Sequence, residues 1–151
     1  MKAITHLAYF AVTSALVGSA FAETPAGWST DLDKALEQAK KEKKAVLVEF
    51  TGSDWCAPCI AVKKAVLSKK EFTEKAAEKF ILVELDFPKK DEALAKKNEP
   101  LREKYGVEGF PTVLLLTAEG KQFSTFNPVQ FMKVDEMLKH LNGELEKKDL
   151  D

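Results

Sequence analysis

Residues Thr51–Ile60, TGSDWCAPCI, contain both cysteines of the 151-residue chain, Cys56 and Cys59. The segment directly follows a short apolar run, AVLVEF, whose valines favour a buried strand. The residues after it, Ala57–Leu67, have helical composition, and Pro58 is tolerated there only in the first turn. The sequence therefore predicts a strand, a loop and a helix, with Cys56 at the helix N-terminus.

A structural disulfide, a metal site and a redox-active pair are three interpretations of this spacing. A disulfide that closes a loop of about four residues stabilises a fold by about 2 kcal/mol, against about 3 kcal/mol for fifteen residues, which argues against a purely structural bond. A closed zinc site needs four Cys or His ligands, and a copper site needs a third donor. Beyond the N-terminal segment the chain adds only His140, which we expect on the polar face of the last helix. A two-thiolate Cu(I) site stays open.

The redox interpretation explains the surroundings of the cysteines as well as their spacing. The N–H groups and dipole of a helix N-terminus favour a thiolate, so we expect Cys56 to have a lowered pKa and to be the attacking sulfur. Cys59, one turn into the helix and less exposed, would then resolve the mixed disulfide. Asp54 acts in the opposite direction, because a nearby carboxylate disfavours a second negative charge.

The rest of the chain predicts alternating helices and strands. Hydrophobic periodicity, caps and turn residues define them. The expected elements are a helix capped by Thr30, a helix over 71–79, a strand over 80–87, a helical turn over 91–97, a helix over 99–105 with Asn98 as cap, Pro100 in its first turn and Gly106 as its C-terminal glycine, an antiparallel hairpin of strands 112–117 and 121–126, a final helix that starts at Asn127–Pro128, and a fraying tail over 144–151.

Two motifs together resemble the thioredoxin superfamily. WCAPC after the AVLVEF strand looks like its active site, and Gly109–Thr112 (GFPT) ahead of a TVLLL strand is similar to its second signature. The resemblance covers about residues 28–141. It implies an α/β thioredoxin fold with a central mixed sheet of four to five strands flanked by helices. It also implies that Pro111 is cis and lies beside the cysteines, and that the backbone of Phe110 binds an extended client peptide.

The other motif residues take their expected roles from this resemblance. Trp55 would shield the disulfide and contact clients, although it could instead pack as a core aromatic. Ala57 and Pro58 separate the cysteines, where the family's central residues help to set the reduction potential; alanine replaces the usual glycine, so the direction of electron flow stays open. Thr112 completes the second signature. The loop before the cysteines is one residue longer than in the cytosolic enzymes and resembles an exported branch.

Glu49 stands inside the apolar run, at a position where the family often has a buried acid, typically aspartate. A desolvated carboxyl group has a raised pKa and could pass protons to or from the Cys59 thiol through water. The alternative is a glutamate that points into solvent at a strand end.

The first 22 residues have the pattern of a signal peptide. Lys2 supplies the charge, Leu7–Val17 is apolar but shorter than the roughly 20 residues of a membrane span, and Ala20–Ala22 provides an A-x-A site. We expect cleavage after Ala22 and location in a bacterial periplasm or outside the cell, without stable membrane insertion. A retained N-terminal anchor is the alternative. Residues 23–151 are then of a size for a single domain.

Charge and resemblance define the expected partners. Without Lys2 the chain has 22 basic and 24 acidic residues, a net charge of −2, which does not favour nucleic acid or an anionic membrane. We expect a monomeric thiol-disulfide oxidoreductase that needs no cofactor and reduces or reshuffles disulfides of client proteins. The resemblance implies that a membrane or soluble electron donor keeps it reduced. The alternative is a non-catalytic binding protein with the same fold, or a Cu(I)-handling dithiol protein.

Overall fold

The computed structural model describes residues 24–150, so the expected signal peptide and its cleavage site lie outside the described residues. None of the helices within this range combines the length and apolarity needed to cross a bilayer. The elements are α1 (Leu32–Glu42), β1 (Ala45–Thr51), α2 (Ala57–Val62), the π-helical turn η1 (Lys63–Leu67), α3 (Lys70–Ala77), β2 (Phe80–Asp86), α4 (Glu92–Lys104), β3 (Thr112–Leu116), β4 (Gln122–Phe126), the 3₁₀ turn η2 (Pro128–Gln130) and α5 (Val134–Leu150).

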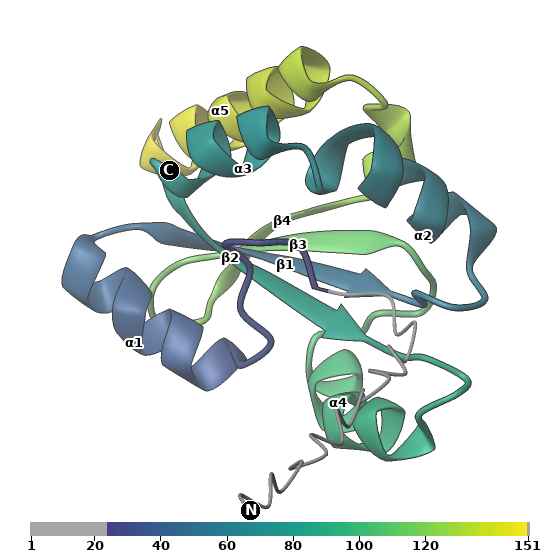
Figure 1. Ribbon diagram of the computed structural model, residues 1–151. Coiled ribbons are helices and arrows are strands. Elements are labelled where there is room, and N and C mark those ends of the chain that lie inside the picture. The colour runs from purple at the N-terminus through teal and green to yellow at the C-terminus, as the bar shows by residue number, and fades with distance from the viewer. Residues whose placement is uncertain (1–23, 151) are drawn as a thin grey trace, which may run out of the picture.

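The centre of the molecule is a mixed four-stranded sheet in the order β2-β1-β3-β4 (Figure 1). β1 is parallel to β2 and antiparallel to β3, and β3 pairs with β4 as the expected antiparallel hairpin. On the outer side of β2, Ser29 forms an isolated parallel bridge with Val83, so the backbone before α1 covers part of that edge. The predicted α/β fold with a mixed sheet is confirmed, with four strands.

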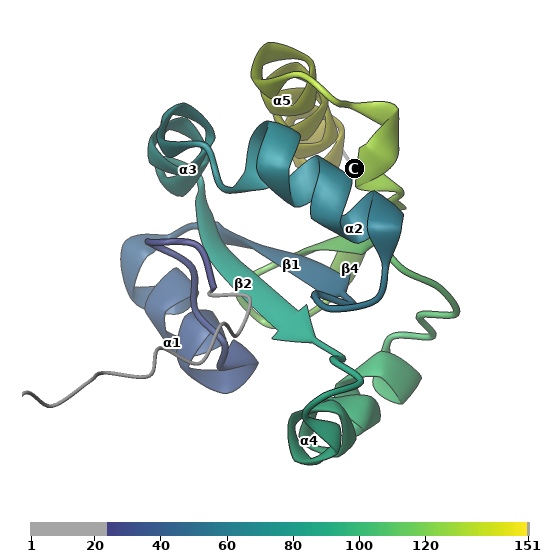
Figure 2. The same ribbon diagram turned by 45° about the vertical axis from the view of Figure 1, so that its right-hand side comes forward.

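Helices cover both faces of the sheet (Figures 1 and 2). α2, α3 and α5 lie on one face, and α1 and α4 lie on the other. Successive residues of a strand point to opposite faces. In β1, Leu47 therefore packs under α2 and α3, whereas Val46, Val48 and Phe50 pack toward α1 and α4. By this alternation Glu49 shares the face of Leu47 and lies on the side covered by α2.

The cysteine-bearing helix is short and irregular. Cys56 is the N-cap of α2 and Pro58 lies in its first turn, as the sequence predicts. After Val62 the helix widens into the π-helical turn η1, a type of distortion often found at functional sites. Lys63 opens this turn, and only 16% of its side chain is exposed. The turn therefore brings a lysine into the layer between helix and sheet.

Several expected element boundaries are wrong. Asp31 rather than Thr30 caps α1, because its carboxylate accepts a hydrogen bond from the N–H of Lys34 at 3.1 Å. Asn127 and Pro128 begin only the turn η2, since Asn127 Oδ1 accepts from the N–H of Val129. The final helix starts later, and the expected fraying tail continues α5 to Leu150.

The helical turn expected over 91–97 and the helix expected over 99–105 form one continuous helix. Asp91 caps it by accepting from the N–H of Leu94 at 3.0 Å, so α4 contains Pro100 in its interior. Asn98 does not cap a helix; its side-chain amide donates to the carbonyl of Asp86 at 2.8 Å and ties α4 to the end of β2. Gly106, with a φ of +63°, follows the end of α4 as predicted.

Candidate active site

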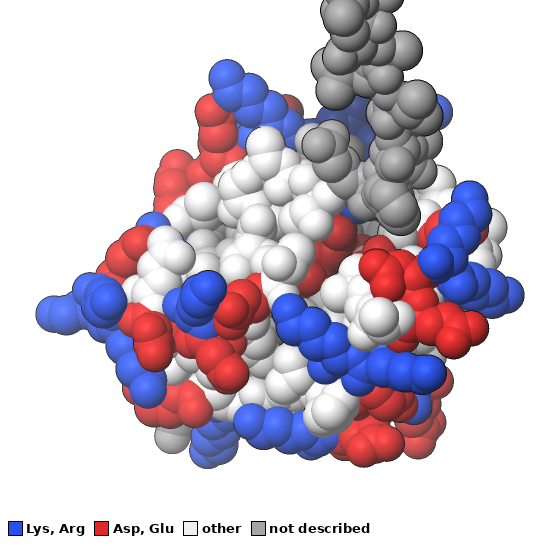
Figure 3. Space-filling model, turned by 60° about the horizontal axis from the view of Figure 1, so that its bottom comes forward, with Lys and Arg blue, Asp and Glu red and all other residues white. Residues whose placement is uncertain are grey.

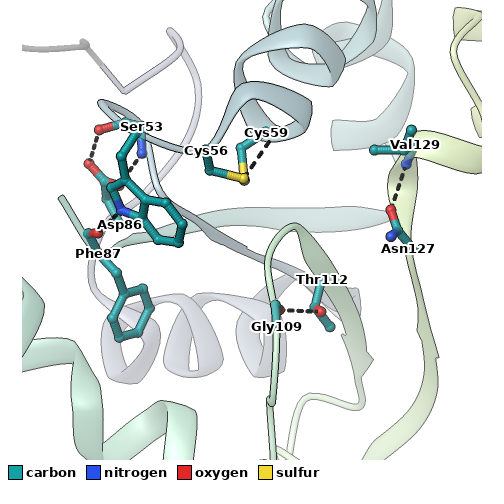
Figure 4. The surroundings of a disulfide bond; sticks show 10 residues. Ser53, Cys56, Cys59, Asp86, Phe87, Gly109, Thr112, Asn127 and Val129 are labelled. Atoms are coloured by element: carbon teal, nitrogen blue, oxygen red, sulfur yellow. Dashed lines mark hydrogen bonds between the residues drawn. A yellow bond between two sulfur atoms is a disulfide. The ribbon is translucent and has the colours of Figure 1, made fainter. Parts of the chain in front are cut away.

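The two cysteines form a disulfide at the start of α2 (Figure 4). Cys56 Sγ accepts a hydrogen bond from the N–H of Cys59 at 3.4 Å, which is the capping contact of the helix. Both cysteines are buried, and Cys59, at 1% exposed, is the less exposed residue, as expected; Cys56 is 5% exposed. No group of three or more metal-ligating side chains is found in residues 24–150.

The second motif forms a tight loop beside the cysteine loop. The Phe110–Pro111 peptide bond is cis. Thr112 Oγ1 donates to the carbonyl of Gly109 at 2.8 Å and closes the loop (Figure 4). The ring of Phe110 meets the edge of Trp55 at a centroid distance of 5.8 Å. The structure therefore brings together the two motifs that the sequence separates by about fifty residues.

Trp55 is partly exposed and does not pack in the core, but its orientation is fixed by contacts with its neighbours. Its side chain is 42% exposed, while its Nε1–H donates to the carbonyl of Phe87 at 2.8 Å. Lys89 Nζ lies 5.1 Å from the centroid of its ring, within cation–π range. The backbone of Gly52 packs closely against the indole, because a Cβ at this position would lie 2.5 Å from Trp55 Cε2. The indole therefore forms a fixed apolar surface next to Cys56.

Two hydrogen-bonded clamps fasten the cysteine loop to the end of β2. The Asp54 carboxylate accepts from the N–H groups of Lys89 and Lys90, each at 2.9 Å, and the hydrogen bond from Lys89 is the main reason that the pKa of Asp54 is lowered. Ser53 donates from its N–H and its hydroxyl to the two carboxylate oxygens of Asp86, at 2.9 and 2.5 Å (Figure 4). Sequence reasoning considered Asp54 only as an opposing charge and missed Asp86.

Glu49 is completely buried, so the alternative of a solvent-facing glutamate is wrong. Neither of its carboxylate oxygens has a hydrogen-bond partner among the described residues. Desolvation, followed by the charge of Glu84, raises the pKa of Glu49 to about 8, and Lys63 opposes this shift. A carboxyl group with such a pKa exchanges its proton near neutral pH, as a general acid or base must.

A second buried carboxyl group lies beside Glu49. Glu84 is the register partner of Glu49 in the parallel β1/β2 pair, so both side chains emerge on the same face. Lys63 Nζ lies 2.9 Å from Glu84 Oε2 in an ion pair that lacks hydrogen-bond alignment. Burial raises the pKa of Glu84, although the contact with Lys63 lowers it. Sequence reasoning missed Glu84, yet the signal was present: FILVELD, like AVLVEF, is an apolar run with one glutamate inside.

The surroundings of His140 differ from expectation. Its ring stacks on Phe131 at 4.2 Å and meets Phe126 edge to face at 4.4 Å, so it is partly buried rather than solvated. Desolvation lowers the pKa of His140. The residue therefore serves the packing of α5 against the segment after β4.

Comparisons with known proteins agree with this geometry. Residues 27–118 match a family described as thioredoxin-like. The chain belongs to this thioredoxin-like family. It is 40% identical over 94 residues to the disulfide bond reductase DsbH of Chlamydia pneumoniae, a match that covers 60% of this chain and 57% of DsbH. It is 33% identical over 98 residues to the thioredoxin-related protein DsbJ of the same organism, covering 63% of this chain and 28% of DsbJ.

A solved structure supports the assignment of the thioredoxin-like fold over most of the chain. The structure of a DsbH oxidoreductase matches with a TM-score of 0.61 and 32% identity, and the match covers 84% of this chain and 95% of that chain. The matched part spans just over half of DsbH and less than a third of DsbJ. Fold and family are thereby established for this thioredoxin-like chain.

Proposed function

We propose that this thioredoxin-like protein is a thiol-disulfide oxidoreductase that reduces or reshuffles the disulfides of client proteins. The observation that carries the proposal is the disulfide between Cys56 and Cys59 at the start of α2, with the cis Pro111 loop beside it. A disulfide at a helix N-terminus is readily reduced to a stabilised thiolate. The similarity to a protein named disulfide bond reductase favours the reducing direction.

The reaction is a sequence of two thiolate attacks. The reduced Cys56 thiolate attacks one sulfur of a client disulfide; a bond forms between Cys56 and that sulfur, the client S–S bond breaks, and the second client sulfur leaves as a thiolate. Cys59 then loses its proton and attacks Cys56 Sγ. The mixed disulfide breaks and the first client sulfur leaves. The client gains two electrons, and the enzyme ends with the Cys56–Cys59 disulfide.

Three neighbours would assist this sequence. Glu49, buried on the sheet face under α2, would accept the proton of Cys59, directly or through water, during the second attack. Trp55 and Phe110 form a contiguous aromatic surface on which a client segment would rest. Ala57 and Pro58 set the conformation of the turn between the sulfurs, and Thr112 closes the opposing loop by its hydrogen bond.

Location and partners follow from the same proposal. The N-terminal pattern supports export, with cleavage after Ala22, so that residues 23–151 work as one domain in a periplasm or outside the cell. A dithiol donor, membrane-bound or soluble, must then return two electrons to the disulfide. Figure 3 shows acidic and basic side chains interspersed over the side on which α1 and α4 lie, which suits protein clients better than nucleic acid.

The test combines a reduction potential with an activity. We would equilibrate the disulfide with glutathione buffers and measure insulin reduction by the wild type and by Cys56→Ser. A potential near that of thioredoxin, about −270 mV, with activity lost in the variant, supports a reductase. A potential near about −120 mV supports an oxidase instead. If the pair neither equilibrates with glutathione nor turns over insulin, the catalytic proposal fails.

A trapping experiment separates the two cysteines. We expect Cys59→Ser to accumulate a mixed disulfide between Cys56 and the client, because the resolving sulfur is absent. The adduct is detected as a band that disappears with reducing agent. Cys56→Ser is the matched control, and equal trapping by both variants would contradict the assigned roles.

A further inference from the structure

Three ionisable side chains form a buried charge cluster beneath the cysteine-bearing helix. We define it as Glu49 on β1, Glu84 on β2 and Lys63 on η1. The parallel register places the two glutamates side by side, and the lysine approaches from the overlying turn. Glu49 is 0% exposed, Glu84 is 2% exposed, and the Lys63 side chain is 16% exposed.

The cluster is unbalanced in charge. One ammonium group faces two carboxyl groups, and it is already paired with Glu84 at 2.9 Å. Glu49 therefore has no ionic partner at contact distance within the described part of the chain. A buried ionised carboxylate without a partner is costly, and the usual response is to take up a proton. The arrangement thus favours a protonated, neutral Glu49 beside an ionised Glu84.

The other groups around Glu49 leave this assignment intact. On β2, Asp86 adds a further negative charge, with its carboxylate held by Ser53. On β3 the register partner of Glu49 is Val113, which is apolar. On the overlying helix α2 the buried ionisable group is Cys59, which titrates only when the disulfide is reduced.

We propose that Glu84 is a positioning residue that acts on Glu49: by holding Lys63, it keeps the ammonium group away from Glu49 and leaves that carboxyl group free to exchange a proton with Cys59. The proton exchange between Glu49 and Cys59 belongs to the proposed function, on which this inference rests. The role of Glu84 is separate from it. If Lys63 paired with Glu49 instead, that carboxylate would stay ionised and could no longer carry a proton near neutral pH.

The test is a titration of Glu49 itself in the oxidised protein, in which the cysteines do not ionise. The side-chain carboxyl carbon of ¹³C-labelled Glu49 is followed by NMR against pH, with Glu49→Gln used for assignment. We expect Glu84→Gln to lower the titration midpoint of Glu49 by about one pH unit or more, because a negative neighbour is lost and Lys63 becomes free. Glu92→Gln, on the exposed face of α4, is the matched control and should leave the midpoint unchanged.

Two further variants separate this mechanism from a packing effect. Lys63→Met should raise the midpoint of Glu49, and the double variant Lys63→Met/Glu84→Gln should lie between the two single variants. If the amide NMR spectrum shows that Glu84→Gln does not fold, the midpoint of Glu49 in Lys63→Met still tests the inference. A midpoint that stays at the wild-type value in both single variants would overturn the inference.

The catalytic consequence is read from the pH profile of insulin reduction. We expect the limb governed by Glu49 to move toward lower pH in Glu84→Gln by the same shift as the NMR midpoint. Activity that falls equally at every pH would assign Glu84 a structural role and overturn the inference. If the wild type reduces no disulfide at any pH, the proposed function fails, whereas the titration still decides whether Glu84 controls Glu49.

Discussion

At the scale of single residues, Gly52 is the position where the cysteine loop tolerates no side chain. A Cβ there would lie 2.5 Å from Trp55 Cε2, so the indole would have to move and would lose its hydrogen bond to the carbonyl of Phe87. We expect Gly52→Ala to lower the free energy of unfolding by about 1–3 kcal/mol and to slow insulin reduction. Urea unfolding measures the first effect. Gly109→Ala is the control for stability, since its Cβ would meet nothing within 4 Å, and equal losses of unfolding free energy in both variants would contradict this prediction.

Residue chemistry could be predicted from the sequence only where it depends on near neighbours in the chain. Cys56 at a helix N-terminus follows from the strand, loop and helix around it. The burial of Glu49 could be anticipated from the apolar residues on both sides, but its lack of an ionic partner could not. Glu49 lacks a partner because Glu84 and Lys63, which belong to other elements, pair with each other.

At the scale of elements, the errors of prediction come from contacts between elements. Asn98 and Pro100 have the pattern of a helix start, yet α4 begins earlier because Asp91 caps it. The Asn98 side chain instead donates a hydrogen bond to the carbonyl of Asp86 at the end of β2. His140 follows the polar periodicity of α5, but the turn after β4 brings Phe131 over its ring. Local patterns predict the type of element well, whereas its ends depend on tertiary partners that no local pattern contains.

Helix α5 offers a test of backbone energetics away from the disulfide. Gly143 lies inside this helix, and a Cβ there would meet nothing within 4 Å. We expect Gly143→Ala to raise the free energy of unfolding by about 0.5–1 kcal/mol, because alanine loses less backbone entropy in a helix than glycine. Gly106→Ala should have the opposite sign, since Gly106 has a φ of +63°. Thermal or urea unfolding measures both, and stabilisation by Gly106→Ala would contradict the prediction.

At the scale of the whole molecule, the fold joins two layers of different chemical character at the sheet. The face under α1 and α4 is lined by apolar residues of β1, such as Val48 and Phe50, whereas the face under α2 carries Glu49 and Glu84 among its apolar side chains. Two motifs far apart in the sequence were enough to predict this fold, because their order and the elements between them leave few alternative topologies. The buried charge between the layers links the stability of the whole domain to pH.

The sign of that link follows from the raised pKa of Glu49. In the unfolded chain a glutamate has a pKa of about 4.3, whereas the folded protein holds Glu49 at about 8. Between these values the folded state binds the proton and the unfolded state does not, so the contribution of Glu49 to stability is complete below about pH 4 and is lost as the pH rises toward 8. The raised pKa of Glu84 acts in the same direction. The lowered pKa of His140 acts in the opposite direction, but only below about pH 6.5, where the unfolded imidazole takes up its proton.

We therefore expect the oxidised protein to lose stability between pH 6.5 and 9, by an amount on the order of a few kcal/mol. Glu49→Gln removes the ionisable group while keeping its shape, so its unfolding free energy should change less over this range and should exceed that of the wild type at pH 9. Urea unfolding at half-unit pH steps measures both curves, and Glu92→Gln, an exposed position, is the control that should follow the wild type. Parallel curves of unfolding free energy against pH for the wild type and Glu49→Gln would mean that Glu49 is ionised in the folded protein. The two curves diverge only if the folded state binds a proton at Glu49 that the unfolded chain does not bind.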